Sequence, residues 1–118
     1  TCTGKANLGA ILMATNRPDE AESLLKSAVH VADSVYPPRH WRKGYLLATY
    51  GRCLLAMNRL ADAETYLVPG YEILSETPQQ VKRLSIARNA LIDLYDATDR
   101  PNLANALRNV PDQRPIAP

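Results

Sequence analysis

Residues 50–64, YGRCLLAMNRLADAE, repeat an earlier stretch of the chain, LGAILMATNRPDEAE at residues 8–22. Several positions match at a single spacing of 42 residues. The matching pairs are Gly9 and Gly51, Leu12 and Leu54, Asn16 and Asn58, Arg17 and Arg59, Ala21 and Ala63, Glu22 and Glu64, and Leu25 and Leu67. A third copy, LIDLYDATDRPNLAN at residues 91–105, follows at a spacing of 41 residues. Self-similarity at a fixed period of this length indicates a repeat protein with three units.

Each unit is predicted to be a pair of helices joined by a tight turn. The apolar residues of 21–35 follow the i, i+3, i+4, i+7 spacing of an amphipathic helix. Pro18 stands in the first turn of that helix, where its missing N–H costs nothing. Asn16 suits the left-handed backbone that closes the preceding helix, as do its counterparts Asn58 and Asp99. Because the turn is short, we expect the two helices to be antiparallel neighbours.

Two glycines and one proline inside the expected helices need a structural reason. Gly9 and Gly51 lie in the first helix of their units, where the lack of a side chain lets the partner helix approach closely. Pro69 falls inside a second helix, where proline removes a hydrogen bond and costs about 3 kcal/mol if the helix stays regular. We therefore expect a kink or a break at Pro69. The six expected helices span about residues 3–15, 18–35, 40–57, 60–76, 79–98 and 101–109.

The composition, 46% hydrophobic and 22% charged over 118 residues, is that of one globular domain. The longest apolar runs have five residues, far short of the ~20 needed to span a bilayer. The net charge is +2 with both signs interspersed, which argues against nucleic-acid binding. Cys2 and Cys53 do not make a disulfide framework, and Cys53, inside an apolar run, is interpreted as a core residue. We expect a cytoplasmic protein, and a chain that starts at Thr1 without Met is expected to be a piece of something longer.

The residue pattern predicts neither catalysis nor a metal or cofactor. His30 and His40 lie ten residues apart, without the spacing or the Cys and carboxylate company of a metal site. Acidic residues recur at the starts of the expected helices, where they are explained by attraction to the positive helix end. The serines lack a neighbouring base, and no Gly-rich phosphate loop is present.

A helix pair of this kind resembles the tetratricopeptide repeat, whose common form has a period nearer 34 residues. The 42-residue period, the Asn-Arg turn followed by Ala-Glu, and the linker YPPRH at residues 36–40 are similar to the longer kinesin-light-chain subtype. Similar units occur in bacterial multidomain signalling proteins, some of them serine/threonine kinases with C-terminal repeat arrays. The resemblance covers residues 5–109. The turn glycine usual in the family is Asn or Asp here, and Ile92 and Arg108 stand in unit three where Gly51 and Leu67 stand in unit two.

The resemblance implies an all-α fold, a right-handed α-solenoid of three antiparallel helix pairs. The helical repeat domain is expected to span residues 1–109, with units at about 3–36, 40–77 and 79–109. The last helix is short and polar, and is expected to cap the stack. Residues 110–118 are expected to form a Pro-rich extended tail.

By the same resemblance, the first helices of the units line a concave groove that holds an extended or helical peptide. Arg52 is suited to pair with a carboxylate, and Asn89 offers a peptide backbone both a donor and an acceptor. A second interpretation pairs Arg52 with Asp93 or Asp96 across neighbouring helices. The groove positions carried across by the repeat spacing are Ala10, Met13, Tyr45, Ala48, Arg52, Asn89, Asp93 and Asp96.

A second candidate patch consists of Arg39, Trp41, Arg42 and Lys43, at the start of the third expected helix. Cations at this end oppose the helix dipole, which is consistent with an anionic partner anchored on Trp41. The favoured alternative is that Trp41 packs inward beneath the linker and the cations are solvated.

The function expected from these patterns is a non-catalytic scaffold that binds a protein or peptide. One alternative is self-association or docking against the parent protein through the exposed terminal helices, which includes a homo-oligomer. The other alternative is a C-terminal regulatory repeat region of a bacterial serine/threonine kinase or a similar signalling protein.

Overall fold

The computed structural model describes residues 8–9, 11–12 and 15–109, and this part of the chain contains helices and no strand. The all-α prediction is therefore confirmed for the described residues. The expected start of the domain at residues 1–7 and the expected tail at 110–118 lie outside them. Residues 8–9 and 11–12 are helical. The further elements are α2 (Pro18–Val35), α3 (Trp41–Ala56), α4 (Leu60–Ser75), the 3-10 helix η1 (Pro78–Gln80), α5 (Val81–Ala97) and α6 (Pro101–Arg108).

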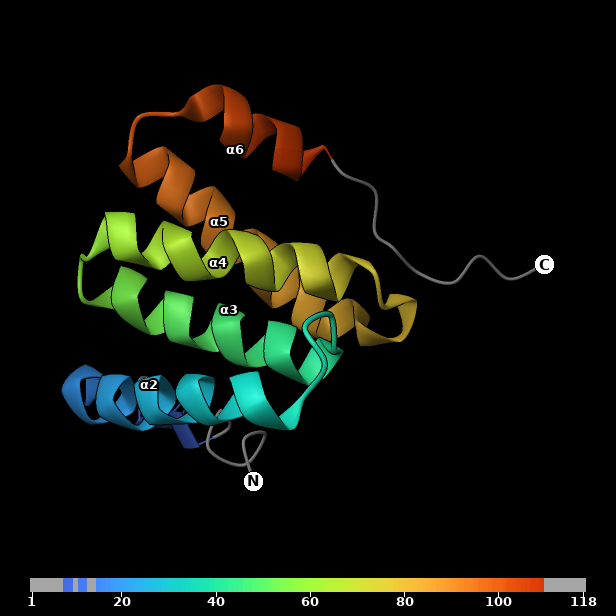
Figure 1. Cartoon of the computed structure of the whole chain (residues 1–118). Helices are drawn as coiled ribbons and strands as arrows, with labels where there is room; N and C mark the ends of the chain where they lie inside the picture. Colours follow the sequence, from blue (N-terminus) through green and yellow to red (C-terminus); the bar gives the residue numbers. More distant parts are fainter. Residues whose placement is uncertain (1–7, 10, 13–14, 110–118) are drawn as a thin grey trace.

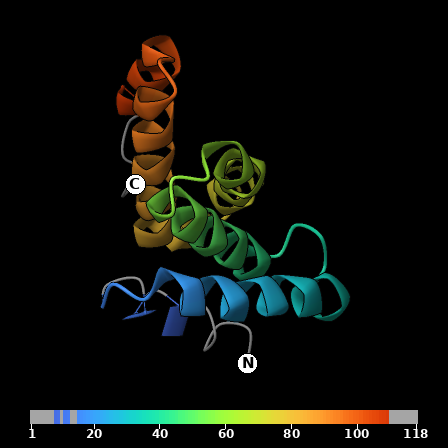
Figure 2. The same cartoon turned by 90° about the vertical axis from the view of Figure 1, so that its left-hand side faces the viewer.

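The helices pack one on the next in chain order. Figure 1 shows them laid on one another from α2 through α3, α4 and α5 to α6. The most extensive packing is between α3 and α4, and α3 also contacts α5 directly. Figure 2 shows that successive helices are turned relative to one another, so that α2 and α5 run in different directions. This arrangement places α3 at the centre of the described part of the chain.

The turns that follow the first helix of each unit share one backbone geometry. Asn16 and Asn58 both have φ 61°, and Asp99 has φ 57°, which confirms the left-handed residues expected there. The residue after each of them donates its backbone N–H to the carbonyl five positions back along the chain, as Arg59 does to Leu54 at 2.9 Å. This hydrogen bond is the mark of a Schellman motif, which satisfies a carbonyl that the end of the helix leaves unpaired.

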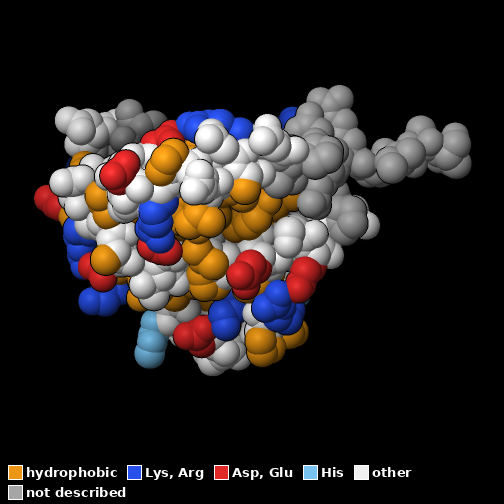
Figure 3. All heavy atoms as spheres, turned by 90° about the horizontal axis from the view of Figure 1, so that it is seen from above, with side chains coloured by type: hydrophobic (Ala, Val, Ile, Leu, Met, Phe, Trp, Pro, Cys, Tyr) orange, Lys and Arg blue, Asp and Glu red, His pale blue; other side chains and the backbone are white. Residues whose placement is uncertain are grey.

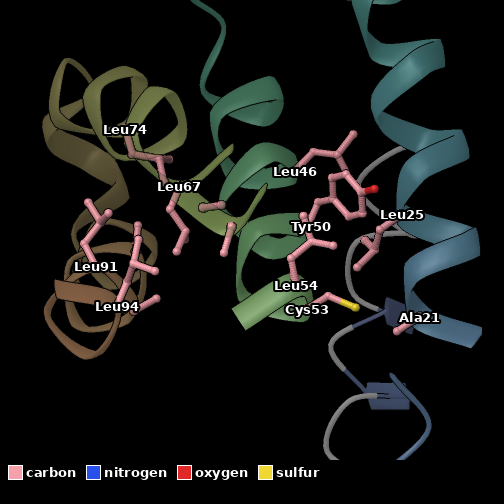
Figure 4. Close-up of a cluster of buried hydrophobic side chains, with 14 of the residues drawn as sticks. Ala21, Leu25, Leu46, Tyr50, Cys53, Leu54, Leu67, Leu74, Leu91 and Leu94 are labelled. Atoms are coloured by element: carbon pink, nitrogen blue, oxygen red, sulfur yellow. The ribbon is translucent and has the colours of Figure 1, made fainter. Parts of the chain in front are cut away.

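Two glycines allow the close helix packing that the repeat predicts. A β-carbon on Gly9 would lie 2.7 Å from Leu25 Cγ, and one on Gly51 would lie 2.5 Å from Leu67 Cγ. Both leucines are fully buried. Figure 4 shows the core on both sides of α3, with Leu25 near Tyr50 on one side and Leu67 beyond α3 on the other. The interpretation of Gly9 and Gly51 as close-packing positions is confirmed.

The structure shows no break at Pro69, because α4 continues through it to Ser75. Of the kink or break expected at Pro69, the break is therefore wrong, and the kink stays a prediction. A proline leaves the carbonyl four residues earlier without its usual donor, and here that residue is Thr65, which is exposed and can be hydrated. The next residue, Gly70, is buried where α4 crosses α3, and a β-carbon on it would lie 2.7 Å from the backbone nitrogen of Ala48. Packing of this crossing offsets the lost hydrogen bond.

Candidate peptide-binding site

The predicted groove residues of units two and three lie on α3 and α5, which contact each other. Tyr45 and Arg52 are half-buried on α3, whereas Asn89 and Asp93 are exposed on α5. Asp96 is also exposed on α5. The predicted positions Ala10 and Met13 lie outside the described residues. The structure thus brings the predicted residues of two units onto adjacent helices.

Ala48 does not belong to an open groove. Its exposed fraction is 2%, and its backbone lies against Gly70 of α4. The repeat spacing alone placed it among the peptide-contacting residues. That placement is wrong because this position of α3 faces the second helix of its own unit.

Arg83, which the sequence analysis did not select, connects two of the residues that it did select. The Arg83 guanidinium carbon lies 4.9 Å from the centre of the Trp41 ring and 4.7 Å from the centre of the Tyr45 ring. Its Nη1 donates a hydrogen bond of 2.7 Å to Gln80 Oε1. Its Nε is buried and has no hydrogen-bond partner among the described residues. Arg83 therefore bridges the starts of α3 and α5, and it forms no ion pair with a carboxylate of the described residues.

The sequence contained one sign of this bridge, which is a pair of aromatic residues spaced four apart. Trp41 and Tyr45 lie one helical turn apart on α3, and they present adjacent rings. An arginine stacked on such rings is attracted by their negative faces, and the stacking orients its guanidinium. What the sequence could not show is that Arg83, some forty residues away, reaches these rings.

Two cations of the second predicted patch have acidic partners within the protein. Arg39 donates to both carboxylate oxygens of Glu76, with 3.0 Å between Nε and Oε1, and this hydrogen bonding holds the pKa of Glu76 below its ordinary value. Lys43 Nζ lies 2.9 Å from Asp33 Oδ1. Arg39 and Lys43 are therefore paired with carboxylates of the protein itself, and they are not simply solvated as the favoured alternative expected.

Trp41 packs partly inward, as the alternative interpretation expected. It is half-buried and contacts the core, and the His40 ring is stacked on it with 6.0 Å between ring centres. His40 itself caps α3, because its Nδ1 accepts a hydrogen bond of 3.1 Å from the backbone nitrogen of Arg42. The Arg42 guanidinium carbon lies 4.7 Å from the Trp41 ring centre. Trp41 thus carries two arginines, Arg42 and Arg83, that make no ion pair with a described residue.

The predicted pairing of Arg52 with Asp93 or Asp96 is not found. Asp96 accepts a hydrogen bond from Arg108 of α6 instead. In the part of the chain that the structure describes, no ion pair reaches Arg52. Arg52 on α3 is therefore, like Arg42 on α3 and Arg83 on α5, a cation whose charge is not offset by any described carboxylate.

The thiol of Cys53 and the hydroxyls of two tyrosines have pKa values raised by burial. Burial raises the pKa of the Cys53 thiol to about 11, and the thiol contacts the Pro18 carbonyl oxygen at 3.4 Å. The interpretation of Cys53 as a core residue is confirmed. Burial also raises the pKa of Tyr50 and of Tyr95. All three groups stay protonated near neutral pH, and the described residues hold no cluster of three potential metal ligands.

A cavity of about 760 Å³ lies between α2, α3 and α4, away from the predicted residues of α5. Its apolar lining comes mainly from Val29, Leu47, Tyr50 and Tyr66, and the Lys43–Asp33 ion pair lies at its edge. Figure 3, a view from the α6 side, shows hydrophobic side chains gathered near the middle of that face with charges of both signs around them.

Comparisons of the chain with protein-family models, with curated proteins and with solved structures gave no match. None of the helices that the structure describes is both long enough and apolar enough to cross a bilayer.

Proposed function

We propose that this chain is a non-catalytic binding module that holds an acidic segment of a partner protein on the face formed by α3 and α5. The proposal includes the finer architecture of the tetratricopeptide class, three antiparallel helix pairs in a right-handed solenoid. In that architecture the first helices of the units share one face, and α3 and α5 are the first helices of units two and three. Their direct contact and the recurring turns support this assignment.

The observation that carries the proposal is the position of Arg83. Its guanidinium is held between Trp41 and Tyr45, and one of its nitrogens is hydrogen-bonded to Gln80. No described carboxylate offsets its charge, whereas Arg39, in the linker before α3, is paired with Glu76. A guanidinium oriented in advance loses little conformational entropy when it binds, so a carboxylate from a partner is a favourable ligand.

The rest of the face suits a peptide main chain and its acidic side chains. Arg52 supplies a second unpaired cation on α3, and the exposed Asn89 on α5 offers both a donor and an acceptor. The exposed Asp93 on the same helix would repel an acidic residue placed next to it. We therefore expect the carboxylates of the peptide to lie toward Arg83 and the N-terminal end of α5.

Tryptophan fluorescence of the protein can report ligand binding at this site. Trp41 is the only tryptophan, and Arg83 is stacked on it, so a ligand at Arg83 is expected to change tryptophan emission. Titration with a Glu-rich peptide and with a matched Gln-rich peptide measures the preference for acid. Hydrogen bonds between charged partners are worth about 1.5–3 kcal/mol, so we expect Arg83→Gln to weaken binding of the acidic peptide at least about tenfold.

Arg39→Gln is the matched control, because it removes an arginine of the same linker region that is already paired with Glu76. It should leave the affinity within about twofold, whereas Arg83→Gln and Arg52→Gln should both weaken binding and its salt dependence. Equal affinity for the Glu-rich and Gln-rich peptides, or unchanged binding by Arg83→Gln, would refute the proposal.

A further inference from the structure

Ion pairs at equivalent positions of the repeat join successive units. Arg59, which follows the turn of unit two, reaches back to Glu22 of unit one, with 2.7 Å between Nη1 and Oε1. Arg100, which follows the turn of unit three, reaches back to Glu64 of unit two, with 2.6 Å between Nη2 and Oε1. Each arginine therefore pairs with a glutamate near the start of the second helix of the preceding unit.

Arg17 is the equivalent arginine of unit one, and its pairing is different. Its only ion pair with a described residue is to Glu20 of its own helix, with 2.9 Å between Nη2 and Oε1. Both side chains of this pair are more than half exposed. Arg59 and Arg100 thus each pair with a preceding unit, whereas Arg17, at the same repeat position, is exposed to solvent.

The apolar residues beside Arg17 show the same difference. Units two and three bury Tyr50 and Leu91 at one repeat position and Cys53 and Leu94 at another, all with exposed fractions of 4% or less. Figure 4 shows Tyr50 and Cys53 directed toward α2 of the preceding unit, and Leu91 and Leu94 on the α4 and α5 side. These positions are therefore the apolar part of the contact between units.

Unit one exposes its residues at these two positions. Leu8, equivalent to Tyr50, is 48% exposed, and Ile11, equivalent to Cys53, is 58% exposed. Leu8, Ile11 and Arg17 thus lie together on one exposed surface. Their equivalents in units two and three contact the preceding unit. We call this surface the unit-one end face.

We propose that the unit-one end face docks a further helix pair with the chemistry of this chain's own units. The helix pair presents a carboxylate to Arg17, at the position that Glu22 and Glu64 occupy, and covers Leu8 and Ile11 with apolar residues of its second helix. Two features define this occupant: a carboxylate that complements the charge of Arg17, and apolar residues at the spacing that covers Leu8 and Ile11. The inference does not depend on the peptide-binding role of α3 and α5.

A second copy of this chain does not fit this description. At the opposite end, Asn105 stands where the repeat has Glu22 and Glu64, so it brings no carboxylate to Arg17. Arg108 stands where Leu25 and Leu67 stand, and it is held by Asn105 and Asp96. This end therefore lacks both the acidic and the apolar group that the unit-one end face would contact.

A chain extended by one unit tests the proposal. A copy of residues 43–84 placed directly before Thr1 keeps the 42-residue spacing and sets its own Glu64 opposite Arg17. Ile11→Ser should lower the Tm of the extended chain by roughly 5–10 °C and leave that of the original chain nearly unchanged. Arg17→Gln should lower the Tm of the extended chain by about 1–3 °C. Changing Glu64 to Gln in the copy alone should produce the same small loss and add nothing to Arg17→Gln.

Two results would overturn the proposal. One is an equal Tm shift for Ile11→Ser in the original and extended chains, which would show that the added unit does not cover this surface. The other is a dimer of the original chain in sedimentation velocity that Ile11→Ser abolishes, which would make a second copy the occupant. A monomer together with Tm losses confined to the extended chain supports the helix pair.

Discussion

Replacing Gly51 by alanine should destabilise the protein, although alanine is the better helix former. The higher helix propensity of alanine contributes about 1 kcal/mol in favour of the variant. The new β-carbon, however, would lie 2.5 Å from Leu67 Cγ and 3.0 Å from the Leu67 backbone nitrogen. Because these atoms are not the flexible tip of the side chain, α3 and α4 must move apart, and overpacking of this kind costs about 1–3 kcal/mol. We expect a net loss of up to about 2 kcal/mol in the free energy of unfolding.

A double-mutant cycle between Gly51 and Leu67 tests whether their close contact causes the loss of stability. Leu67 is fully buried, so Leu67→Ala alone should cost about 2–5 kcal/mol. In the double variant, the methyl group of the new alanine enters space that Leu67 vacates, so the two losses should fall short of additivity by about 1 kcal/mol. Urea denaturation followed by circular dichroism measures all four proteins.

Helix propensity needs its own control at a position without packing. Ser27 is exposed in the middle of α2, so the difference between Ser27→Gly and Ser27→Ala reports propensity alone. If Gly51→Ala stabilised the protein by that same difference, or if the cycle with Leu67→Ala were strictly additive, the close-packing argument would be refuted.

Three further predictions follow from the turn, an ion pair and the thiol. Asn58→Ala should cost about 1 kcal/mol in urea denaturation because alanine is strained at φ 61°, whereas Asn58→Gly should be tolerated. The hydrogen bond from Arg100 lowers the pKa of Glu64, so the contribution of this pair to stability is present above the unfolded pKa and is lost as the pH falls through the folded one. The Tm of the native chain should therefore fall by about 1–3 °C more than that of Arg100→Gln between pH 6 and pH 3, and parallel curves would contradict this. In a Cys2→Ser background, Cys53 should react with a thiol reagent only after unfolding, because it is buried and its pKa is about 11; rapid reaction of the folded protein would argue otherwise.

Local features of the chain were predictable because local chemistry determines them. The left-handed residue Asn58 and the start of α2 at Pro18 follow from backbone preferences that act within a few residues. The close approach at Gly51 followed from the repeat, since the same residue type recurs at the same position. These features set the bounds of the helices and the pairing of neighbours.

Features that depend on contacts between distant segments were not predictable in the same way. Ala48 looked available on α3, but Gly70 of α4 brings another backbone against it. Arg83 contacts Trp41 only because α5 packs on α3, and no short-range sequence pattern predicts that contact. Pro69 was expected to kink or break α4, but α4 continues through it, because the helix is packed on α3 at Gly70.

The two ion pairs between units also bear on how such a chain can change in length. Glu22 and Arg59 are 37 residues apart, whereas Glu64 and Arg100 are 36 residues apart, yet both pairs form. The difference of one residue lies near the linker between units, because α4 ends earlier in its repeat than α2 does. Insertions and deletions should therefore be accepted in evolution around residues 36–40 and 76–80 and rejected in the turns at Asn16, Asn58 and Asp99.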